Sequence, residues 1–232
     1  MKNRGVLGIG HNILGVITFL VMSLALYMIF MWVPEEATMG PVQKIFYFHV
    51  GTAWIGFFAF FIVFIASIAY LRTKERKWDI LAEASAEIGV VFITLVIITG
   101  PIWARSAWNT WWTWEPRLTT SLILWFIYIA YVLVRASAME SEKKARLAAI
   151  FGIIGFIDVP IVFLSIKFWS LNHPFLIENG KMNLDPDMFK TLMVSVLTFT
   201  LLYVYLLQKG MAISYIRDEI NSIKGKLREK FD

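Results

Sequence analysis

A short segment near the middle of the chain contains the most unusual residues in the sequence. Within the stretch "SAWNTWWTWEPRL" four tryptophans fall in seven residues: Trp108, Trp111, Trp112 and Trp114. An indole offers a broad apolar face and one N–H donor. Two arginines, Arg105 and Arg117, border the cluster, and a guanidinium pairs readily with carboxylates. These residue types are suited to holding a large planar ligand that carries acidic groups.

Three histidines are the side chains that could bind a metal ion, and a neutral imidazole is a common axial ligand of haem iron. His49 lies in "FYFHVGTAW" and His173 in "FWSLNHPF", one before and one after the tryptophan segment, whereas His11 lies near the N-terminus. The chain has no cysteine, which excludes disulfides, thiolate metal sites and covalent haem attachment through a C-x-x-C-H motif. The chemistry must therefore use histidine, carboxylates, aromatic rings or arginine.

The spacing of the tryptophans indicates how they could form a surface. If the segment is locally helical, one face carries Trp108, Trp111 and Trp112, and Trp114 points elsewhere. A porphyrin would suit this flat platform, and Arg105 and Arg117 are placed to pair with its two propionates. Glu115 cannot do so, and we expect it to hold Arg117 or to accept indole N–H bonds.

The elements that carry these residues are predicted to cross a membrane. The chain of 232 residues is 58% hydrophobic and only 17% charged, with a mean hydropathy of +0.65. A helix that spans the hydrocarbon core needs about 20 mainly apolar residues. Six runs fit this length: roughly 13–33, 46–71, 81–103, 118–136, 147–168 and 188–208. The sequence therefore predicts an all-α integral membrane protein with six transmembrane helices in a single domain, residues 1–232.

The distribution of basic residues predicts the orientation, because cytoplasmic loops carry the excess of lysine and arginine. With the N-terminus inside, only six of the 22 basic residues fall near or in the outer loops: Lys44, Arg105, Arg117, Lys167, Lys181 and Lys190. The outer loops are then 34–45, 104–117 and 169–187. Both termini are cytoplasmic, and the tryptophan-rich loop, His49 and His173 lie on the outer face. His11 lies at the cytoplasmic start of the first span, where it can meet water.

Two interpretations of these residues compete. An isolated histidine at a membrane interface usually makes only a headgroup or loop hydrogen bond, and an interfacial belt accounts for one or two tryptophans at a helix end. A belt does not explain four within seven residues. His49 and His173 lie on the same side, in different segments, with the aromatic segment between them. Because two imidazoles bind opposite sides of a porphyrin only from facing segments, we predict that this pair ligates haem iron.

The tryptophan segment also resembles a known motif. "WNTWWTWEPRLTTSLILW" is similar to the haem-handling motif W-G-x-W-W-x-W-D-x-R-L-T of the CcmC-type cytochrome c maturation proteins. Three further segments resemble the same family, namely "KIFYFHVGTAWIG", "AEIGVVFITLVIITGPIW" and "DVPIVFLSIKFWSLNH", and the resemblance covers most of residues 41–175. The chain departs from the pattern with Asn109 for glycine, Glu115 for aspartate, Gly51 for a frequent proline, and Pro174 after the histidine.

The resemblance implies a haem-binding delivery protein of the cytoplasmic (inner) membrane rather than an enzyme. Its cargo would be haem b, bound transiently and without a covalent bond at the outer face, with His49 and His173 as the axial pair. The implied partners are a membrane-anchored haem chaperone (CcmE-type), ABC transporter subunits (CcmA- and CcmB-type) and a small membrane subunit (CcmD-type). The net charge of +5 reflects topology and contact with membrane lipid, and we expect no nucleic-acid partner.

Several features leave alternatives open. A bis-histidine haem subunit of a membrane oxidoreductase is the main rival function, and a passive transporter subunit is another. Asp158 lies near Pro160 in the fifth span, where it could hydrogen-bond backbone groups freed by the proline or act in haem passage. Glu83 and Glu87 are expected to face the membrane interface or a partner. The basic segment "KGKLREK" could contact anionic lipid headgroups or another subunit.

Overall fold

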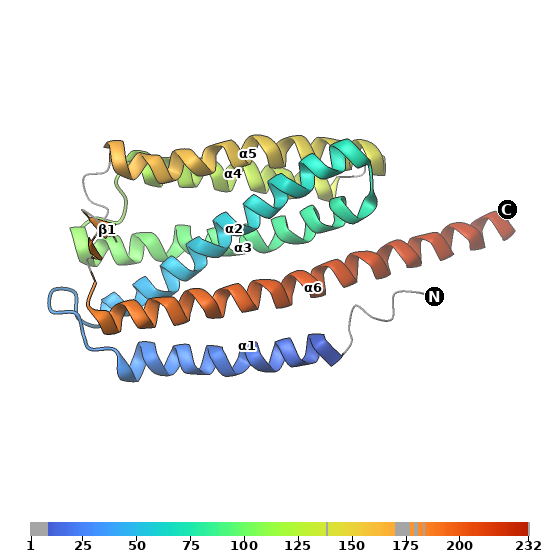
Figure 1. Ribbon diagram of the computed structural model, residues 1–232. Helices are drawn as coiled ribbons and strands as arrows, with labels where there is room; N and C mark the ends of the chain where they lie inside the picture. The colour runs from blue at the N-terminus through green and yellow to red at the C-terminus, as the bar shows by residue number, and fades with distance from the viewer. Residues whose placement is uncertain (1–8, 138, 170–176, 179–180, 183, 232) are drawn as a thin grey trace.

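The computed structural model of the protein is a bundle of long helices with a small hairpin at one end (Figure 1). The structure describes residues 9–137, 139–169, 177–178, 181–182 and 184–231. The long helices are α1 (Ile9–Tyr27), α2 (Lys44–Thr73), α3 (Arg76–Trp108), α4 (Pro116–Ala136), α5 (Ser141–Trp169) and α6 (Pro186–Phe231). One π-helical turn, Met28–Trp32, continues α1, and a 3-10 turn, Pro41–Gln43, leads into α2. The strands β1 (Ile177–Glu178) and β2 (Lys181–Met182) pair in antiparallel fashion.

The prediction of an all-α protein with six membrane-spanning helices is confirmed. Within the described residues, six helices are long and apolar enough to cross a membrane. They extend beyond the apolar runs, most of all in α6, which continues past Lys209 to Phe231. An apolar run reports the thickness of the hydrocarbon core, whereas a helix can continue into water where lysine, arginine and glutamate favour it.

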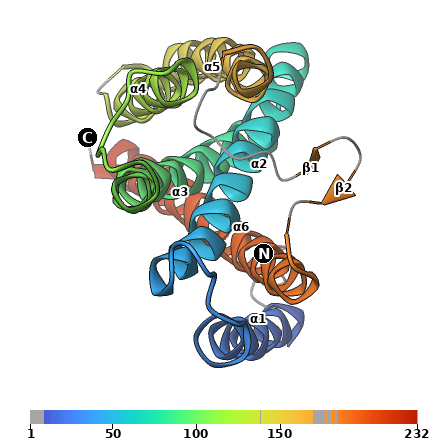
Figure 2. The same cartoon turned by 90° about the vertical axis from the view of Figure 1, so that its left-hand side faces the viewer.

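The helices pack around α2, which contacts α3, α5 and α6. Figure 2 looks along the bundle and shows α2 in the middle, with α4 and α5 on one side and α6 and α1 on the other. Phe60 of α2 stacks on Tyr128 of α4, with ring centroids 3.5 Å apart. A Cβ atom at Gly89 would lie 2.6 Å from the Phe60 ring. Glycine therefore lets α3 approach α2 closely, as small residues do in membrane helix interfaces.

Gly51 has a similar packing role between α2 and α6. A Cβ atom at this position would lie 2.4 Å from the ring of Phe199. The hydroxyl of Ser195 donates a hydrogen bond of 2.7 Å to the backbone oxygen of Tyr47 at the same contact. The close approach of α6 thus accounts for glycine where the family resemblance led us to expect a frequent proline.

The alternating helices place the connections at two ends of the bundle. The helix ends that the connections α1–α2, α3–α4 and α5–α6 join lie at one end, which we call the tryptophan end because it carries residues 109–115 (Figure 1). The first residue of α1 and the last of α6 lie toward the opposite end. Both ends of the described chain therefore lie on the same side of the bundle, as an even number of membrane crossings requires. Which side of the membrane each end faces is still a prediction from the basic residues.

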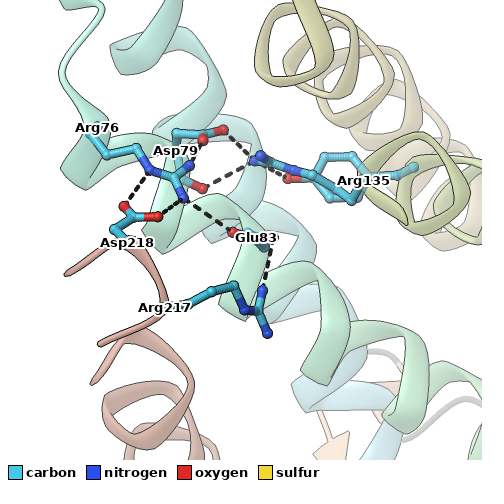
Figure 3. Close-up of polar contacts among 7 residues, drawn as sticks. Arg76, Asp79, Glu83, Arg135, Arg217 and Asp218 are labelled. Atoms are coloured by element: carbon cyan, nitrogen blue, oxygen red, sulfur yellow. Dashed lines mark hydrogen bonds and ion pairs between the residues drawn. The ribbon is translucent and has the colours of Figure 1, made fainter. Parts of the chain in front are cut away.

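A cluster of charged residues joins α3, α4 and α6 at the opposite end (Figure 3). Asp79 is only 2% exposed and accepts hydrogen bonds from Arg76 and from Arg135 of α4. Arg76 also binds both carboxylate oxygens of Asp218, at 2.8 and 3.0 Å. Two arginines and two aspartates therefore compensate one another's charge at the point where α6 leaves the bundle.

Glu83 belongs to the same cluster. Its carboxylate lies 4.0 Å from Arg76 and 3.9 Å from Arg217 of α6. Glu83 therefore pairs with arginines of its own chain, in addition to any contact with the interface or with a partner.

Asp158 of α5 is a carboxylate without such a partner among the described residues. In this part of the chain its Oδ2 atom is buried and has no hydrogen-bond partner. Its Oδ2 therefore makes no bond to the backbone groups freed by Pro160, which was one of the two roles considered for Asp158.

Candidate haem-binding site

A cavity at the tryptophan end brings several of the predicted site residues together. It encloses about 570 Å³ of space between atoms, part of which is open to solvent. Its walls come from three helices: His49 and Phe57 on α2, Gly100 and Trp103 on α3, and Arg117 at the start of α4. A histidine and an arginine thus face an otherwise mainly apolar pocket that could take a flat ligand.

His49 is held in one orientation by Thr99. The Nδ1 atom of His49 lies 2.8 Å from the Oγ1 atom of Thr99. The Thr99 hydroxyl donates its own proton to the backbone oxygen of Leu95, at 2.7 Å, so its oxygen is left to accept a hydrogen bond from Nδ1–H. This arrangement places the imidazole lone pair on Nε2. A histidine that binds a metal ion is typically oriented in this way by a bond to its other nitrogen.

Gly100 provides room for the imidazole ring. A Cβ atom at Gly100 would lie 3.3 Å from Cε1 of His49, closer than an ordinary contact. Because Gly100 follows Thr99 directly on α3, one residue orients the ring and the next accommodates it. Sequence analysis missed both, since a contact between positions 49 and 99 leaves no local pattern in the chain.

The tryptophan loop is not helical, so the conditional prediction of a helical platform is wrong. α3 ends at Trp108, and Asn109 adopts a left-handed backbone conformation with φ 55° and ψ 23°. Asparagine in this conformation is a common end to a helix. Residues 110–115 then run without helical structure to Pro116, the first residue of α4. Trp108 is placed as the last residue of α3, but its side chain is outside the described part of the structure.

The remaining indoles divide into an inner and an outer group. Trp103 and Trp112 line the cavity, whereas Trp111 is 58% exposed and Trp114 is 76% exposed. Trp112 meets Trp114 edge to face, with ring centroids 5.8 Å apart and planes at 76°. This contact links the exposed part of the loop to the cavity wall.

The indole N–H groups of the inner pair differ in their bonding. Nε1 of Trp103 donates a hydrogen bond of 3.3 Å to the side-chain oxygen of Gln43, which precedes α2. Nε1 of Trp112 is buried and has no hydrogen-bond partner among the described residues. A buried donor without a partner is costly, so an acidic group of a bound ligand could stabilise the structure by accepting from Nε1 of Trp112.

The two arginines predicted to pair with propionates have different positions. Arg117 lines the cavity. Arg105 is exposed, and its Nη1 donates to the backbone oxygen and to the side-chain oxygen of Asn109, at 2.5 and 2.6 Å. A cation near the last carbonyls stabilises a helix end. In this structure Arg105 therefore shapes the turn after α3, and Arg117 is the arginine that faces the cavity.

Glu115 precedes α4, and the charge of Arg117 acts on its carboxyl group. Burial raises the pKa of the Glu115 carboxyl above its ordinary value, and the charge of Arg117 partly offsets this shift. Its backbone oxygen accepts a hydrogen bond from the N–H of Thr119 at 3.1 Å. Glu115 thus contributes both to the start of α4 and to the charge balance around the guanidinium.

The two other histidines lie apart from this cavity or outside the description. His173, the predicted second axial ligand, falls outside the described residues. His11 is only 5% exposed, and its ring stacks on Tyr205 at 4.6 Å while Nδ1 bonds Gln208 at 3.0 Å. The expectation that His11 meets water is therefore wrong, because α6 covers it. It joins α1 to α6, far along the chain from the tryptophan loop.

The described residues contain no group of three or more histidine, aspartate or glutamate side chains placed to bind a metal ion. An iron porphyrin needs only axial ligands from the protein, since the macrocycle supplies the equatorial nitrogens. The apolar walls, the free lone pair of His49 and the guanidinium of Arg117 match the parts of such a molecule.

Comparison with known proteins points to the same class of ligand. The family model described as heme exporter protein C matches residues 6–225. The chain is 31% identical to heme exporter protein C of Bradyrhizobium diazoefficiens over 209 residues, which cover 89% of this chain and 79% of the relative. It is 28% identical to the proteins of that name from Rhodobacter capsulatus (184 residues, 77% and 75%) and Escherichia coli K12 (173 residues, 75% and 70%). The chain therefore belongs to the heme exporter protein C family.

Proposed function

We propose that the protein binds haem at the tryptophan end and delivers it to a membrane-anchored haem chaperone during the biogenesis of c-type cytochromes. The name of its relatives supports a role in haem handling. The single observation that supports the site is His49, whose Nδ1 is held by Thr99 at 2.8 Å beside a cavity that also contains Arg117. This arrangement leaves Nε2 free to take an axial position on iron.

Each part of the cavity has a role in holding the cargo. His49 supplies one axial nitrogen, and Arg117 pairs with a propionate. The faces of Trp103 and Trp112 pack on the porphyrin, and the unpartnered N–H of Trp112 donates to a carboxylate. His173 is proposed as the second axial ligand on the basis of the sequence alone.

Delivery requires binding that is strong enough to orient haem and weak enough to release it. Aromatic contacts spread the interaction over a wide surface, each worth about 0.5–1.5 kcal/mol beyond its buried area. Trp111 and Trp114 are largely exposed, so they could cover the outer edge of the porphyrin until the chaperone replaces them. The protein therefore acts by binding and transfer, and we propose no catalytic residue.

The proposed location is the cytoplasmic (inner) membrane, with the tryptophan end toward the periplasm or cell exterior. The basic residues support this orientation, because all but six of the 22 fall on the other side. The proposed partners are those of the family resemblance: a CcmE-type chaperone, CcmA- and CcmB-type transporter subunits and a CcmD-type membrane subunit. The rival haem oxidoreductase is less well supported, since electron transfer across the membrane would need a second haem with its own ligand pair at the other end, and only one of the described histidines, His11, lies toward that end (Figure 1).

Covalent haem on the co-expressed chaperone tests the proposal. Arg117→Gln should lower chaperone loading while the protein accumulates normally in the membrane, because a propionate loses its partner. Arg72→Gln is the matched control, since Arg72 lies in the last turn of α2 at the opposite end and should load normally. Normal loading by the Arg117 variant would contradict the proposed site.

A further inference from the structure

The C-terminal part of α6 extends well beyond the rest of the bundle. α6 contains 46 residues without a break, a length of about 69 Å at 1.5 Å per residue. The hydrocarbon core of a membrane is only about 30 Å thick. Figure 1 shows the last part of α6 projecting past the ends of α2, α3, α4 and α5. This helix therefore carries a segment that the membrane cannot cover.

Ion pairs fix the point where the projection begins. Asp218 binds Arg76, and Arg217 lies 3.9 Å from Glu83, both on α3 (Figure 3). Every residue from Glu219 to Phe231 is exposed. An isolated helix of about a dozen residues is only marginally stable in water. The projection is thus held at its base and lacks packing along the rest of its length.

One face of the projecting helix is apolar. Five residues follow one another at intervals of three, four, three and four: Ile213, Ile216, Ile220, Ile223 and Leu227. We call this set the α6 stripe. Its members are between 46% and 56% exposed. Alternating steps of three and four residues form the seam of a coiled coil, in which the apolar side chains of one helix insert between those of another.

Lipid does not account for the whole stripe. Asp218 of α6 and the buried Asp79 of α3 lie at the same height along the bundle, because both bind Arg76. Ile220, Ile223 and Leu227 follow Asp218 and therefore lie beyond this level. Because α6 continues as one helix, these residues stand off the end of the bundle rather than turning onto a membrane surface (Figure 1). An apolar row in water commonly marks a protein interaction site.

The charges beside the stripe indicate what kind of helix would pair with it. Between positions 224 and 230 the helix has four basic residues and one acidic residue: Lys224, Lys226, Arg228, Lys230 and Glu229. A second copy inserted in the same membrane in the same orientation would align in parallel and bring these basic segments side by side. Like charges at such positions oppose pairing, whereas acidic residues on the partner would favour it.

We propose that the α6 stripe binds an amphipathic helix of another polypeptide, with an apolar face and acidic borders, at the end of the molecule opposite the tryptophan loop. The surface is separate from the haem cavity and does not depend on the proposed haem function. It would provide a subunit contact that leaves the tryptophan end open for the chaperone.

Cysteine labelling can test this surface, because the chain has no cysteine of its own. Single cysteines replace Ile220, Ile223 or Leu227 on the stripe, and Ser222 or Gly225 on the other face as matched controls. A membrane-impermeant maleimide is applied to open membranes from the protein's own cells and to the purified chain in nanodiscs. A partner that occupies about 90% of sites should slow labelling roughly tenfold at the stripe. The control positions should react equally in both preparations.

The other possible occupants give different results. Protection of the stripe in anionic nanodiscs without another protein would show that headgroups cover it, and disulfides between two copies through Ile220→Cys would show self-pairing. Either result would overturn the proposal, as would equal labelling of both faces in native membranes.

A charge variant tests the acidic borders. Lys224→Glu with Lys226→Glu should abolish the protection of Leu227→Cys, and persistent protection would rule out an acidic partner. Gly225→Ala serves as the folding control, because a Cβ atom there has open space around it and alanine favours the helix. This variant should keep the full protection.

Discussion

Thr99→Val removes the hydroxyl that orients His49 and leaves the helix and its bulk nearly unchanged. In the structure the Thr99 oxygen accepts from Nδ1 of His49 at 2.8 Å, and its proton is engaged by Leu95 at 2.7 Å. Without it, the imidazole loses the bond that keeps its lone pair on Nε2. Removing such a supporting partner typically costs about 10- to 100-fold in metal affinity. At 1.4 kcal/mol per tenfold change this is about 1.4–2.8 kcal/mol, similar to the roughly 1–3 kcal/mol of an unsatisfied buried donor.

The assay is a haem titration of the purified protein in nanodiscs, followed by absorbance. Thr99→Val should bind haem about 10- to 100-fold more weakly, and Thr99→Ser, which retains a hydroxyl, should recover most of the affinity. Thr18→Val is the matched control, because the Thr18 hydroxyl also donates to a backbone oxygen in its own helix, at 2.8 Å to Leu14, but makes no hydrogen bond to a histidine in the described part of the structure. Wild-type affinity in Thr99→Val, or equal losses in the valine and serine variants, would refute the role assigned to Thr99.

Three further predictions concern the loop and the topology. Trp111→Ala with Trp112→Ala should abolish chaperone loading although His49 is intact, whereas single phenylalanine changes should only slow it; normal loading by the double variant would reduce these indoles to an interfacial belt. Asn109→Gly should be tolerated, and Asn109→Val should destabilise the turn by about 1–2 kcal/mol because it disfavours a left-handed backbone, as thermal unfolding can measure. A cysteine at Thr110 should react with an impermeant thiol reagent from outside and one at Thr73 should not, and the reverse pattern would overturn the orientation.

Much of the fold could be predicted because membrane burial leaves a direct signal in the sequence. Six apolar runs predicted six helices, and the structure has them. The ends of the helices were harder to predict from the sequence, since the apolar signal stops at the membrane surface while backbone hydrogen bonding continues. α6 shows this most clearly, because its charged continuation to Phe231 is helical.

The candidate site could be predicted only in part, and that part also came from the predicted membrane spans. Topology alone placed His49 near Trp112 and Arg117, and the cavity contains all three. The local shape of the loop could not be predicted from the sequence. One residue with a left-handed backbone, Asn109, ends the helix that would have placed the indoles on one face. Arg105 was assigned to a ligand on charge alone, whereas its closest acceptors are on Asn109.

Residues that act through distant contacts could not be found from the sequence. Gln43 bonds Trp103 across 60 positions, and Thr99 bonds His49 across 50. His11 is buried because Tyr205, on α6, stacks on it. Neither a periodic pattern nor a motif marks such pairs, so three-dimensional packing is needed to identify them.

The absorption spectrum of the purified protein and of its His49→Ala variant tests the central claim most directly. The protein reconstituted with haem should show the bands of low-spin iron with two imidazole ligands. His49→Ala should retain less haem and show shifted bands, and added imidazole should restore the low-spin spectrum by occupying the space that the side chain leaves. A variant that retains haem with the unchanged spectrum would show that iron binds elsewhere and would contradict the proposed site.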